Sequence, residues 1–501
     1  MFLTILLILV TLTILYLYIF KYKYKYWERH GIPYSTPVFP YGNIILGKEL
    51  HWGQQTLRDY LKFKDQSPIY GGFRMVTPCV YVTSPELAKS MMIKDFHSFY
   101  GRGMYENYRD DPLSAHLFNL SGPRWKKLRE KLTPVFTTGK IKYMMPTLTK
   151  VGENLVEALS DEVKIESTVD MKEWIARFTT DVIGTVAFGL ECNSLKDPEA
   201  EFRKQGKRVL SEMNPLKILM ALNFPKFSRD ALHLTITPKD LTAFFLKAVE
   251  DTVNFREENN IQRNDFMDLL IKMRNKDKSN DFDKDQDKEG FSLYEMAAQA
   301  FIFFVAGFET SSTLTSYTLL ELALNPELQT KARNHINEVL KKHNNELTYE
   351  ALQDMTYIEQ CMNESLRKYP TLALLFREAT EDYPIPEINY TIKKGTFCLI
   401  PSYAFNHDPE LWPEPSKFDP DRFENFTTAM GHEKGFYPFG EGPKNCIGER
   451  FGKIQTKLGL VMILKNFELM KSEKTEFPVK FNTTIALLAP KNPIYIKMEK
   501  L

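Results

Sequence analysis

The hydrophobic pattern divides the chain into an apolar N-terminal segment, a long helical region and a C-terminal region of short strands. Residues 1–20 carry no charge, and a helix of this length, at about 1.5 Å per residue, is long enough to cross the hydrocarbon core of a bilayer. Short β-branched and aromatic runs between Ile69 and Val82 predict a hairpin. Helical periodicity then dominates until about Tyr369.

The clearest helix signal lies near the middle of the chain. Ser292-x-x-Glu295 is a capping box, and apolar positions continue from it to Leu324. Asn325-Pro326 predicts the end of this helix and the cap of the next one. Such a long and largely apolar helix is expected to cross the centre of the domain.

After Arg367 the helical pattern gives way to prolines and short strand-like runs, of which Thr396–Ile400 is the clearest. Helix returns from Ile447 to about Leu469, and strand-like segments end the chain. No internal repeat and no second linker is visible in the pattern. It predicts a single mainly α (α+β) domain over residues 46–501, with small sheets.

Residues 21–45 are basic and rich in proline, and we expect them to form a hinge between anchor and domain. Lys21, Lys23 and Lys25 alternate with aromatic residues, a pattern typical of the cytoplasmic side of a membrane. A cleaved signal peptide is disfavoured, because the segment has no basic n-region and no small-residue cleavage site. The sequence therefore predicts a single-pass anchor with the domain in the cytosol.

Composition excludes several classes of function. The 501-residue chain has a net charge of +1, which argues against a nucleic-acid partner held by bulk electrostatics. Its five cysteines include no close CxxC pair, which fits neither a disulfide framework nor a zinc site and favours a reducing compartment. The densely charged run Arg274–Glu289 predicts a solvated loop.

The candidate chemistry centres on the stretch Phe439–Gly448, which contains Cys446. A lone cysteine is usually structural, and we assign that role to the other four. Here three glycines allow a tight turn and close approach to a flat ligand, and Phe439 is placed to limit water at the sulfur. A helix beginning near Ile447 would favour the thiolate through its N–H groups and dipole. We interpret Cys446 as the ligand of a haem iron.

A second motif, Ala306-Gly307-Phe308-Glu309-Thr310, lies within the central helix. Ala306 and Gly307 are small, so a planar group could lie against the helix there. A carboxylate and a hydroxyl are costly inside an apolar helix, which makes Glu309 and Thr310 candidates for proton delivery. The alternative, a polar face on an exposed helix, is disfavoured by the apolar neighbours.

Two further groups would support such a site. Glu364 and Arg367 are spaced i, i+3 on a helix, and with Arg422 they could form a network that holds the loop leading to the cysteine. Donors suited to an anionic carboxylate are Trp125 and Arg129, spaced i, i+4, and Arg377. Taken singly, each of these residues would be interpreted as an ordinary cation or a packed indole.

Taken in order, these motifs resemble those of the cytochrome P450 superfamily, the haem-thiolate monooxygenases. The resemblance covers the whole chain and includes Trp125-x-x-x-Arg129, Ala306-Gly307-x-Glu309-Thr310, Glu364-x-x-Arg367, Pro420-x-Arg422-Phe423 and Phe439-x-x-Gly442-x-x-x-Cys446-x-Gly448. More narrowly, Asp181–Gly189, Phe308–Ser312 and Arg377-x-x-Thr380-x-Asp382-Tyr383 look like insect microsomal enzymes of family 6.

The resemblance implies a cytochrome P450 fold with bound haem b. The implied roles are Cys446 as axial ligand, Trp125, Arg129 and Arg377 as propionate donors, Ala306, Gly307 and Phe439 beside the haem, Glu309 and Thr310 in dioxygen activation, and Glu364, Arg367 and Arg422 as a structural network. Lys444 stands where an arginine is usual and keeps the charge without the fork geometry. Propionate binding and reductase docking are both open for it.

The reaction implied is transfer of one dioxygen atom to a hydrophobic molecule, such as a xenobiotic, plant toxin, insecticide, lipid or hormone, at the endoplasmic reticulum membrane. Electrons would come from NADPH through NADPH–cytochrome P450 reductase, with cytochrome b5 as a further partner, because the chain has no flavin or nicotinamide fingerprint. We hypothesise a basic docking patch of Lys126, Lys127, Lys131, Lys434, Lys444 and Lys453.

Apolar stretches suggest where a substrate would bind, although each could equally be core. The candidate lining residues are Phe118, Phe301, Phe304, Leu374, Leu375 and Ile485. The segment Pro215–Phe227 mixes apolar residues with lysines and is expected to touch the membrane surface.

Two other classes of function remain. The first is a haem-thiolate isomerase or dehydratase without a reductase, which would not need the acid–alcohol pair Glu309–Thr310. The second is a non-catalytic haem sensor or carrier, which would not need an apolar pocket beside that pair.

Overall fold

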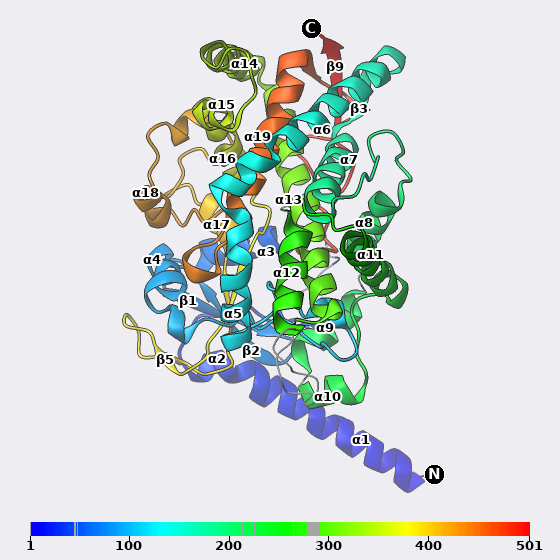
Figure 1. Ribbon diagram of the computed structural model, residues 1–501. Helices are drawn as coiled ribbons and strands as arrows, with labels where there is room; N and C mark the ends of the chain where they lie inside the picture. Colours follow the sequence, from blue (N-terminus) through cyan, green and yellow to red (C-terminus); the bar gives the residue numbers. More distant parts are fainter. Residues whose placement is uncertain are drawn as a thin grey trace.

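Helices make up most of the structure. The computed structural model describes residues 2–44, 47, 49–212, 214–224, 226–263, 265–278 and 291–501. Within these ranges, three small sheets accompany a large helical body (Figure 1). This confirms the predicted mainly α class with small sheets. Most of the predicted loop Arg274–Glu289, residues 279–289, lies outside the described residues.

The elements before residue 290 are largely helical, with a hairpin near the start. They are α1 (Phe2–Leu17), α2 (Tyr26–Arg29), α3 (Trp52–Phe63), β1 (Ile69–Arg74), β2 (Thr77–Val82), α4 (Pro85–Lys89), α5 (Gly122–Leu132), α6 (Thr138–Ile165), β3 (Thr168–Asp170), α7 (Met171–Ile183), α8 (Glu201–Ser211), α9 (Pro215–Asn223), α10 (Lys226–Ala231), α11 (Lys239–Glu258) and α12 (Phe266–Lys278).

Helices and short strands alternate in the second half. They are α13 (Leu293–Leu324), α14 (Pro326–Lys342), α15 (Tyr349–Asp354), α16 (Thr356–Lys368), β4 (Leu375–Glu378), β5 (Tyr383–Pro384), β6 (Thr391–Ile392), β7 (Phe397–Ile400), α17 (Ser402–Asn406), α18 (Thr428–Glu433), α19 (Glu449–Asn466), β8 (Phe467–Lys471) and β9 (Tyr495–Lys500).

Helix α13 runs through the middle of the molecule, where α7, α11, α16 and α19 pack against it (Figure 1). The predicted capping box is present: the Ser292 hydroxyl accepts from the Glu295 N–H at 3.2 Å, and the Glu295 carboxylate accepts from the Ser292 N–H at 3.0 Å. The helix ends before Asn325 as predicted. The Asn325 amide donates back to the Glu321 carbonyl, however, and does not cap α14.

The largest sheet has the strand order β1-β2-β7-β4. Strands β1 and β2 form the predicted antiparallel hairpin, β2 runs parallel to β7, and β7 runs antiparallel to β4. Gly71 is required within β1, because a Cβ there would lie 2.3 Å from the indole of Trp27. Two smaller sheets have the orders β3-β9-β8 and β5-β6.

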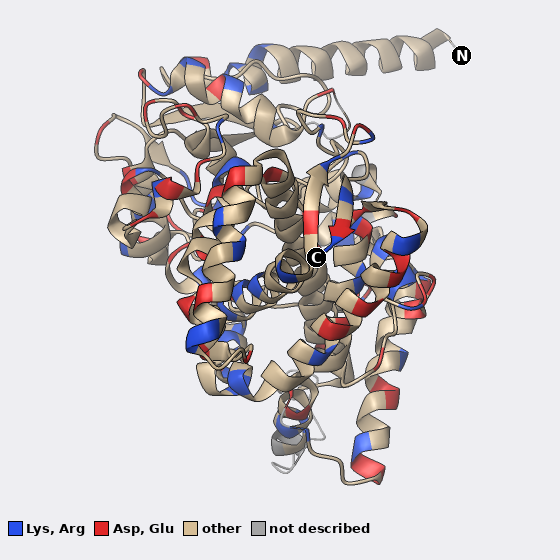
Figure 2. Ribbon diagram, turned by 90° about the horizontal axis from the view of Figure 1, so that it is seen from above, with Lys and Arg blue, Asp and Glu red and all other residues tan. Residues whose placement is uncertain are grey.

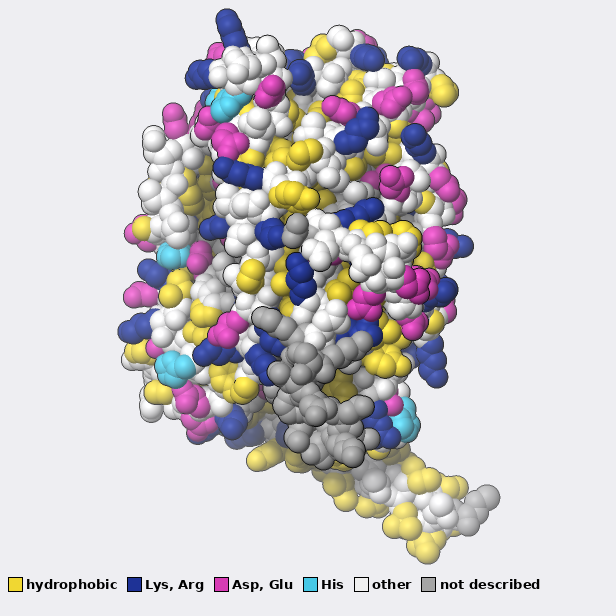
Figure 3. Space-filling model, in the orientation of Figure 1, with side chains coloured by type: hydrophobic (Ala, Val, Ile, Leu, Met, Phe, Trp, Pro, Cys, Tyr) yellow, Lys and Arg dark blue, Asp and Glu magenta, His cyan; other side chains and the backbone are white. Residues whose placement is uncertain are grey.

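Helix α1 projects from the body with its apolar side chains exposed (Figures 1 and 3), and it carries no charged residue (Figure 2). Among the described residues, the helical run Phe2–Arg29 is long and apolar enough to cross a membrane by length and composition. The predicted hinge packs on the domain: Trp27 is fully buried, its indole N–H donates to the Gly72 carbonyl at 2.8 Å, and the Ser35 N–H donates to the Gly71 carbonyl.

Candidate functional site

The loop of residues 439–448, which we call the cysteine loop, is a closed turn. The Cys446 N–H donates to the Phe439 carbonyl at 2.8 Å. Gly440 and Gly442 have φ values of 70° and 69°, in a left-handed backbone region that residues with a Cβ rarely adopt. A Cβ on Gly442 would also lie 1.9 Å from the backbone oxygen of Met92. These two positions therefore require glycine.

The electrostatic surroundings of Cys446 differ from the prediction. Helix α19 begins at Glu449, two residues after the predicted Ile447, and the N–H of its N-cap Gly448 hydrogen-bonds the Cys446 sulfur. Burial raises the pKa of the Cys446 thiol, and the Gly448 N–H and the nearby arginines lower it by less. The side chain has accessible surface even though it lies deep in the protein, as expected beside an internal space. A cation at the sulfur is needed to favour the thiolate.

Two arginines hold the cysteine loop through its backbone. Arg129 of α5 donates to the Asn445 carbonyl at 2.9 Å and to its side-chain oxygen at 2.7 Å. Arg102 donates to the Lys444 carbonyl at 2.8 Å. Sequence reasoning missed Arg102 and Asn445, although an arginine between two glycines, Gly101 and Gly103, was a signal for the former.

Lys444 and Arg377 add two cations beside the loop that are more deeply buried, each with 2 % of its surface exposed. The Lys444 ammonium donates to the Leu120 carbonyl at 2.9 Å and lies 4.3 Å from the ring centroid of Trp125, which is itself buried. Arg377 donates to the Phe376 carbonyl, while its Nε and Nη2 have no hydrogen-bond partner in the described part of the chain.

Acids offset these four cations only weakly: Glu106 raises the pKa of Lys444, but by less than burial and the neighbouring arginines lower it. Burial lowers the pKa of Arg102 to about 9, of Arg377 to about 10 and of Lys444 to about 6, and repulsion from neighbouring arginines contributes to the shifts of Arg102 and Lys444. No ion pair between described residues involves any of the four. Such a cluster, with unpartnered N–H groups, fits a ligand that carries more than one carboxylate.

The donor set also limits how a metal could be held. Among the described residues, no group of three or more His, Cys, Asp or Glu side chains could bind a metal ion. One cysteine beside four cations therefore fits a metal that is held in a macrocycle bearing carboxylates. Cys446 would be the axial ligand of that metal. The two propionates of haem match the cation cluster of Arg102, Arg129, Arg377 and Lys444.

Helix α13 presents its small residues to different neighbours. Ala306 is exposed although most of the helix is buried, as expected where a central helix borders an internal space. The Thr310 hydroxyl donates to the Ala306 carbonyl at 2.6 Å. Gly307 faces α7 instead, because a Cβ there would lie 2.5 Å from the side chain of Ile183. The close approach of α7 therefore requires a small residue at Gly307, and its place beside a planar ligand stays a prediction.

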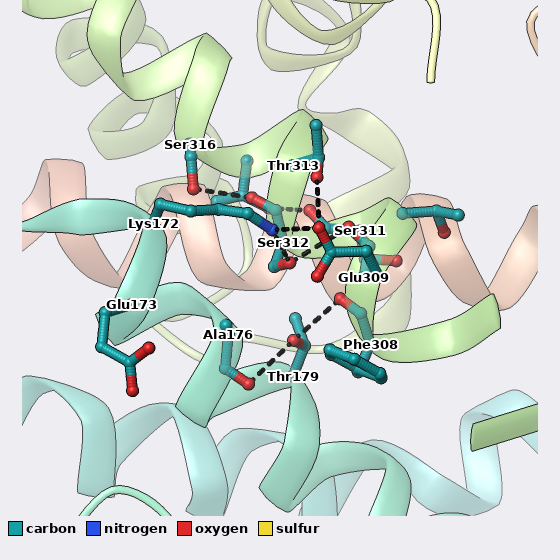
Figure 4. Close-up of polar contacts among 12 residues, drawn as sticks. Lys172, Glu173, Ala176, Thr179, Phe308, Glu309, Ser311, Ser312, Thr313 and Ser316 are labelled. Atoms are coloured by element: carbon teal, nitrogen blue, oxygen red, sulfur yellow. Dashed lines mark hydrogen bonds and ion pairs between the residues drawn. The ribbon is translucent and has the colours of Figure 1, made fainter. Parts of the chain in front are cut away.

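Glu309 lies in a polar cluster between α13 and α7 (Figure 4). Its carboxylate is 3.0 Å from the ammonium of Lys172 and accepts from the Thr313 hydroxyl at 3.4 Å. Lys172 also donates to the Ser312 hydroxyl at 2.6 Å. Burial lowers the pKa of Lys172, and Glu309 raises it. Sequence reasoning missed Lys172, since nothing in the pattern of α7 places it opposite Glu309.

The predicted network is brought together. Arg367 and Glu364 form a bidentate pair at 2.7 and 2.8 Å, and both side chains are fully buried. Arg422 approaches the same carboxylate at 3.4 Å. Arg367 also donates to the carbonyls of Asn406, Pro415 and Lys417. This arginine therefore joins α16 to the chain that leads into the cysteine loop.

The predicted substrate residues differ in how much of each side chain is exposed. Phe304 has no exposed surface, and the rings of Phe188, Phe202, Phe245 and Phe308 surround it, so it packs the core and does not line a pocket. Leu374 and Phe301 are 2 % and 7 % exposed. The partly accessible members are Phe118, Leu375 and Ile485.

The predicted docking lysines differ in exposure. Lys444 is buried, so it cannot belong to a surface patch, and its place is with the cation cluster. Lys453 pairs with Glu449 at 3.0 Å, and Lys434 donates to the Leu411 carbonyl. Lys126 and Lys127 of α5 are exposed, and Lys131 is partly exposed.

Comparison with known proteins agrees over nearly the whole length. Residues 33–498 match the family described as Cytochrome P450. The chain is 43% identical over 478 residues to "Probable cytochrome P450 6a13" of Drosophila melanogaster, covering 95% of this chain and 94% of the relative. It is 40% identical over 483 residues to "Cytochrome P450 6a2" of the same species, covering 95% of each. It is 39% identical over 482 residues to "Cytochrome P450 6A1" of Musca domestica, covering 95% and 94%.

Proposed function

Since this chain belongs to the cytochrome P450 family and is a monooxygenase of that family, we propose that it oxidises hydrophobic small molecules at the endoplasmic reticulum membrane with electrons from NADPH–cytochrome P450 reductase. Haem, when bound, supplies the activation of dioxygen, of which one atom enters the substrate and the other leaves as water. Cytochrome b5 is proposed as a second electron donor.

The observation that carries this proposal is one accessible cysteine beside four cations, two buried and two partly buried, that form no ion pair with the described acids. Cys446 would be the axial ligand, and the iron would supply the positive charge that the sulfur needs to ionise. Arg102, Arg129, Arg377 and Lys444 would bind the propionates. In the same positions, Arg102 and Arg129 keep the backbone of the cysteine loop in place.

We propose that Thr310 and Glu309, neighbouring residues of α13 with different partners, deliver protons. The Thr310 hydroxyl donates to the Ala306 carbonyl, so its lone pairs remain able to accept a hydrogen bond. Glu309 pairs instead with Lys172 of α7. Proton delivery by Glu309 therefore needs the Lys172 pair to open, and Lys172 would control how often the carboxylate is free.

We propose two contacts with the membrane. The first is α1, whose side chains are apolar and exposed. The second is the region of α9 and α10, which lies at the same end of the molecule (Figure 1) and exposes Leu216, Phe227 and Leu232 by 61%, 75% and 58%. Exposed large apolar residues at one end are typical of a membrane-contacting surface.

For the reductase, we propose that Lys126, Lys127 and Lys131 of α5 dominate the docking surface. They lie on the same helix as Arg129, which contacts the cysteine loop, and this supports a docking surface near the thiolate side. Reversing the charge of Lys126 and Lys127 to glutamate should lower reductase-supported turnover and leave oxidation driven by hydrogen peroxide unchanged. An equal loss in both assays would show that the lysines do not act through the reductase.

The proposed function is tested by a reduced-plus-carbon-monoxide difference spectrum of the haem-loaded protein. We expect the red-shifted band of a thiolate-ligated haem, and its loss in Cys446→Ser. Product formed under labelled dioxygen should carry the label, which separates a monooxygenase from an isomerase or a carrier. Folded, haem-loaded protein without that band, in which Cys446→Ser behaves like the unaltered chain, would overturn the proposal.

A further inference from the structure

A small cavity lies where the hinge after α1 meets the domain. Its walls come from the hinge, α3 and the hairpin of β1 and β2, and its polar lining includes Ser35, Asn43, Arg58, Asp59 and Tyr70. About 60 Å³ of it is open to the centres of water molecules, which is room for about four to six waters. A small polar headgroup therefore fits, and no lining residue belongs to the cysteine loop or its cation cluster.

Tyr70 gives this cavity a polar group that the folded chain leaves unused. Its side chain is 1 % exposed, and its hydroxyl has no hydrogen-bond partner in the described part of the chain. The ring is held in place, because it stacks on the ring of Tyr81 with 4.8 Å between the centroids. A buried hydroxyl without a partner is costly, so a group that enters the cavity and hydrogen-bonds it is favoured.

Two opposite charges from α3 also line the cavity. The Asp59 carboxylate accepts from the Ser35 hydroxyl at 2.6 Å, and that hydroxyl accepts from the Asn43 amide at 3.2 Å, so the hinge fixes the acid in position. The Asp59 side chain is 20 % exposed, whereas the neighbouring Arg58 side chain is 74 % exposed, with its Nε 3.5 Å from the carboxylate. A fixed acid inside and a freer cation outside fit a zwitterion that enters with its ammonium group first.

The cavity lies at the end of the molecule from which α1 projects (Figure 1). Val38 and Gly42 line it, and their backbones exchange two hydrogen bonds of 2.8 Å. The turn between them exposes Phe39 and Tyr41 by 51% and 43%. The Phe39 ring centroid is 5.5 Å from that of Phe20, the last residue of the uncharged N-terminal run. Aromatic residues where an apolar helix meets its first charges are typical of the headgroup level of a bilayer.

We propose that this cavity binds the headgroup of an ethanolamine phospholipid from the membrane that α1 crosses. The primary ammonium group would donate to the Asp59 carboxylate and the Tyr70 hydroxyl, and Arg58 would bind the phosphate outside. A primary ammonium group has three N–H donors, whereas the bulkier trimethylammonium group of choline has none. The inference rests on the membrane contact proposed for α1, and it is independent of the haem chemistry.

The test compares two soluble headgroups, glycerophosphoethanolamine and glycerophosphocholine. Their binding is measured by equilibrium dialysis on the full-length, haem-loaded protein in detergent. We expect the ethanolamine compound to bind at least about tenfold more tightly, because only its ammonium group can hydrogen-bond. Tyr70→Phe and Asp59→Asn should each reduce this preference to about threefold or less. The matched controls Tyr108→Phe and Asp65→Asn change exposed residues outside the cavity and should keep the preference.

A second arm uses the lipid itself. In bilayer discs, replacing part of the phosphatidylcholine by phosphatidylethanolamine should raise Tm of the unaltered protein by about 2 °C and leave Tm of both cavity variants unchanged. Binding of the soluble headgroup without this rise would overturn the lipid assignment. Equal binding of the two headgroups, binding of neither, or an unchanged preference in the variants would overturn the site, since the cavity would then hold water only. The carbon monoxide spectrum of each protein tests the proposed function separately, whatever the dialysis shows.

Discussion

Alanine substitutions at the three glycines of the cysteine loop separate two physical effects. Gly440 needs only the left-handed backbone, because a Cβ there meets its nearest atom at 3.8 Å. Gly442 needs that backbone and also the empty space beside the Met92 oxygen. Gly448 needs neither, since its φ is −94° and a Cβ would be 3.6 Å from the Phe136 ring.

The magnitudes follow from these distances. Left-handed backbone costs an alanine roughly 1–2 kcal/mol, which sets the loss expected for Gly440→Ala. At Gly442 the Cβ would be 1.9 Å from a backbone oxygen, closer than real Cβ contacts occur, so the chain must move by about 1 Å. Overpacking of this kind adds about 1–3 kcal/mol, for a total of roughly 2–5 kcal/mol. Gly448→Ala should stay within about 0.5 kcal/mol, because a less favourable N-cap offsets the stiffer unfolded chain.

The assay is thermal unfolding of the full-length protein, followed by circular dichroism at one scan rate. An unfolding entropy of about 2.1 cal/mol/K per residue gives roughly 1 kcal/mol/K for a domain of this size, so each kcal/mol lowers Tm by about 1 °C. We expect losses of about 1–2 °C for Gly440→Ala, about 2–5 °C with reduced haem retention for Gly442→Ala, and almost none for Gly448→Ala. A Gly448 variant as damaged as the Gly442 variant would refute the reasoning.

Three further predictions concern charged side chains. Lys172→Met should lower the free energy of unfolding by about 3–5 kcal/mol, because it leaves the Glu309 carboxylate buried without a cation. Adding Glu309→Gln should restore most of this loss in a double-mutant cycle; equal losses in the single and the double variant would contradict this. Burial raises the pKa of Glu173, but its cationic partners outweigh burial and lower the pKa to about 2. The stability that this carboxylate contributes is therefore present above about pH 4.5 and is lost as the pH falls towards 2. Glu173→Gln should lower Tm at pH 6 by about 3 °C, and the difference from the unaltered protein should shrink below pH 4. Arg367→Lys should prevent recovery of folded protein, because lysine cannot replace the bidentate pair and the three carbonyl contacts of Arg367. Arg422 makes a single 3.4 Å contact with Glu364, so Arg422→Lys should be recovered in folded form. Similar yields of the two variants would argue against this difference.

Local signals were sufficient for the elements of the fold. The capping box at Ser292 and Glu295 and the hairpin Ile69–Val82 were predictable, because each depends on residues close together in the chain. The pairing of Glu364 with Arg367 was predictable for the same reason, since residues spaced i, i+3 on a helix face one another.

Contacts between distant segments could not be predicted in this way. The sequence predicted that a helix end at Cys446 would favour the thiolate; the N-cap Gly448 does donate to the sulfur, but burial has the larger effect and raises the pKa of the thiol. It assigned Gly307 to a ligand and gave no sign of the helix packing that places this glycine against Ile183 of α7. It had no means to find Lys172 opposite Glu309, because the two lie 137 positions apart in the numbering and meet only through the packing of α7 on α13.

By itself the sequence determined the apolar first helix, the order of the motifs and the identity of the single cysteine suited to bind iron, because these depend on residue type and short spacing. Only the folded chain shows which charged side chains lie close together. Lys444 is buried beside the cysteine loop and not on the surface, and Arg102 donates to the carbonyl of Lys444 although the two lie 342 positions apart. The physical reason is that burial and repulsion depend on what surrounds a side chain in space, and the surroundings exist only once the chain has folded.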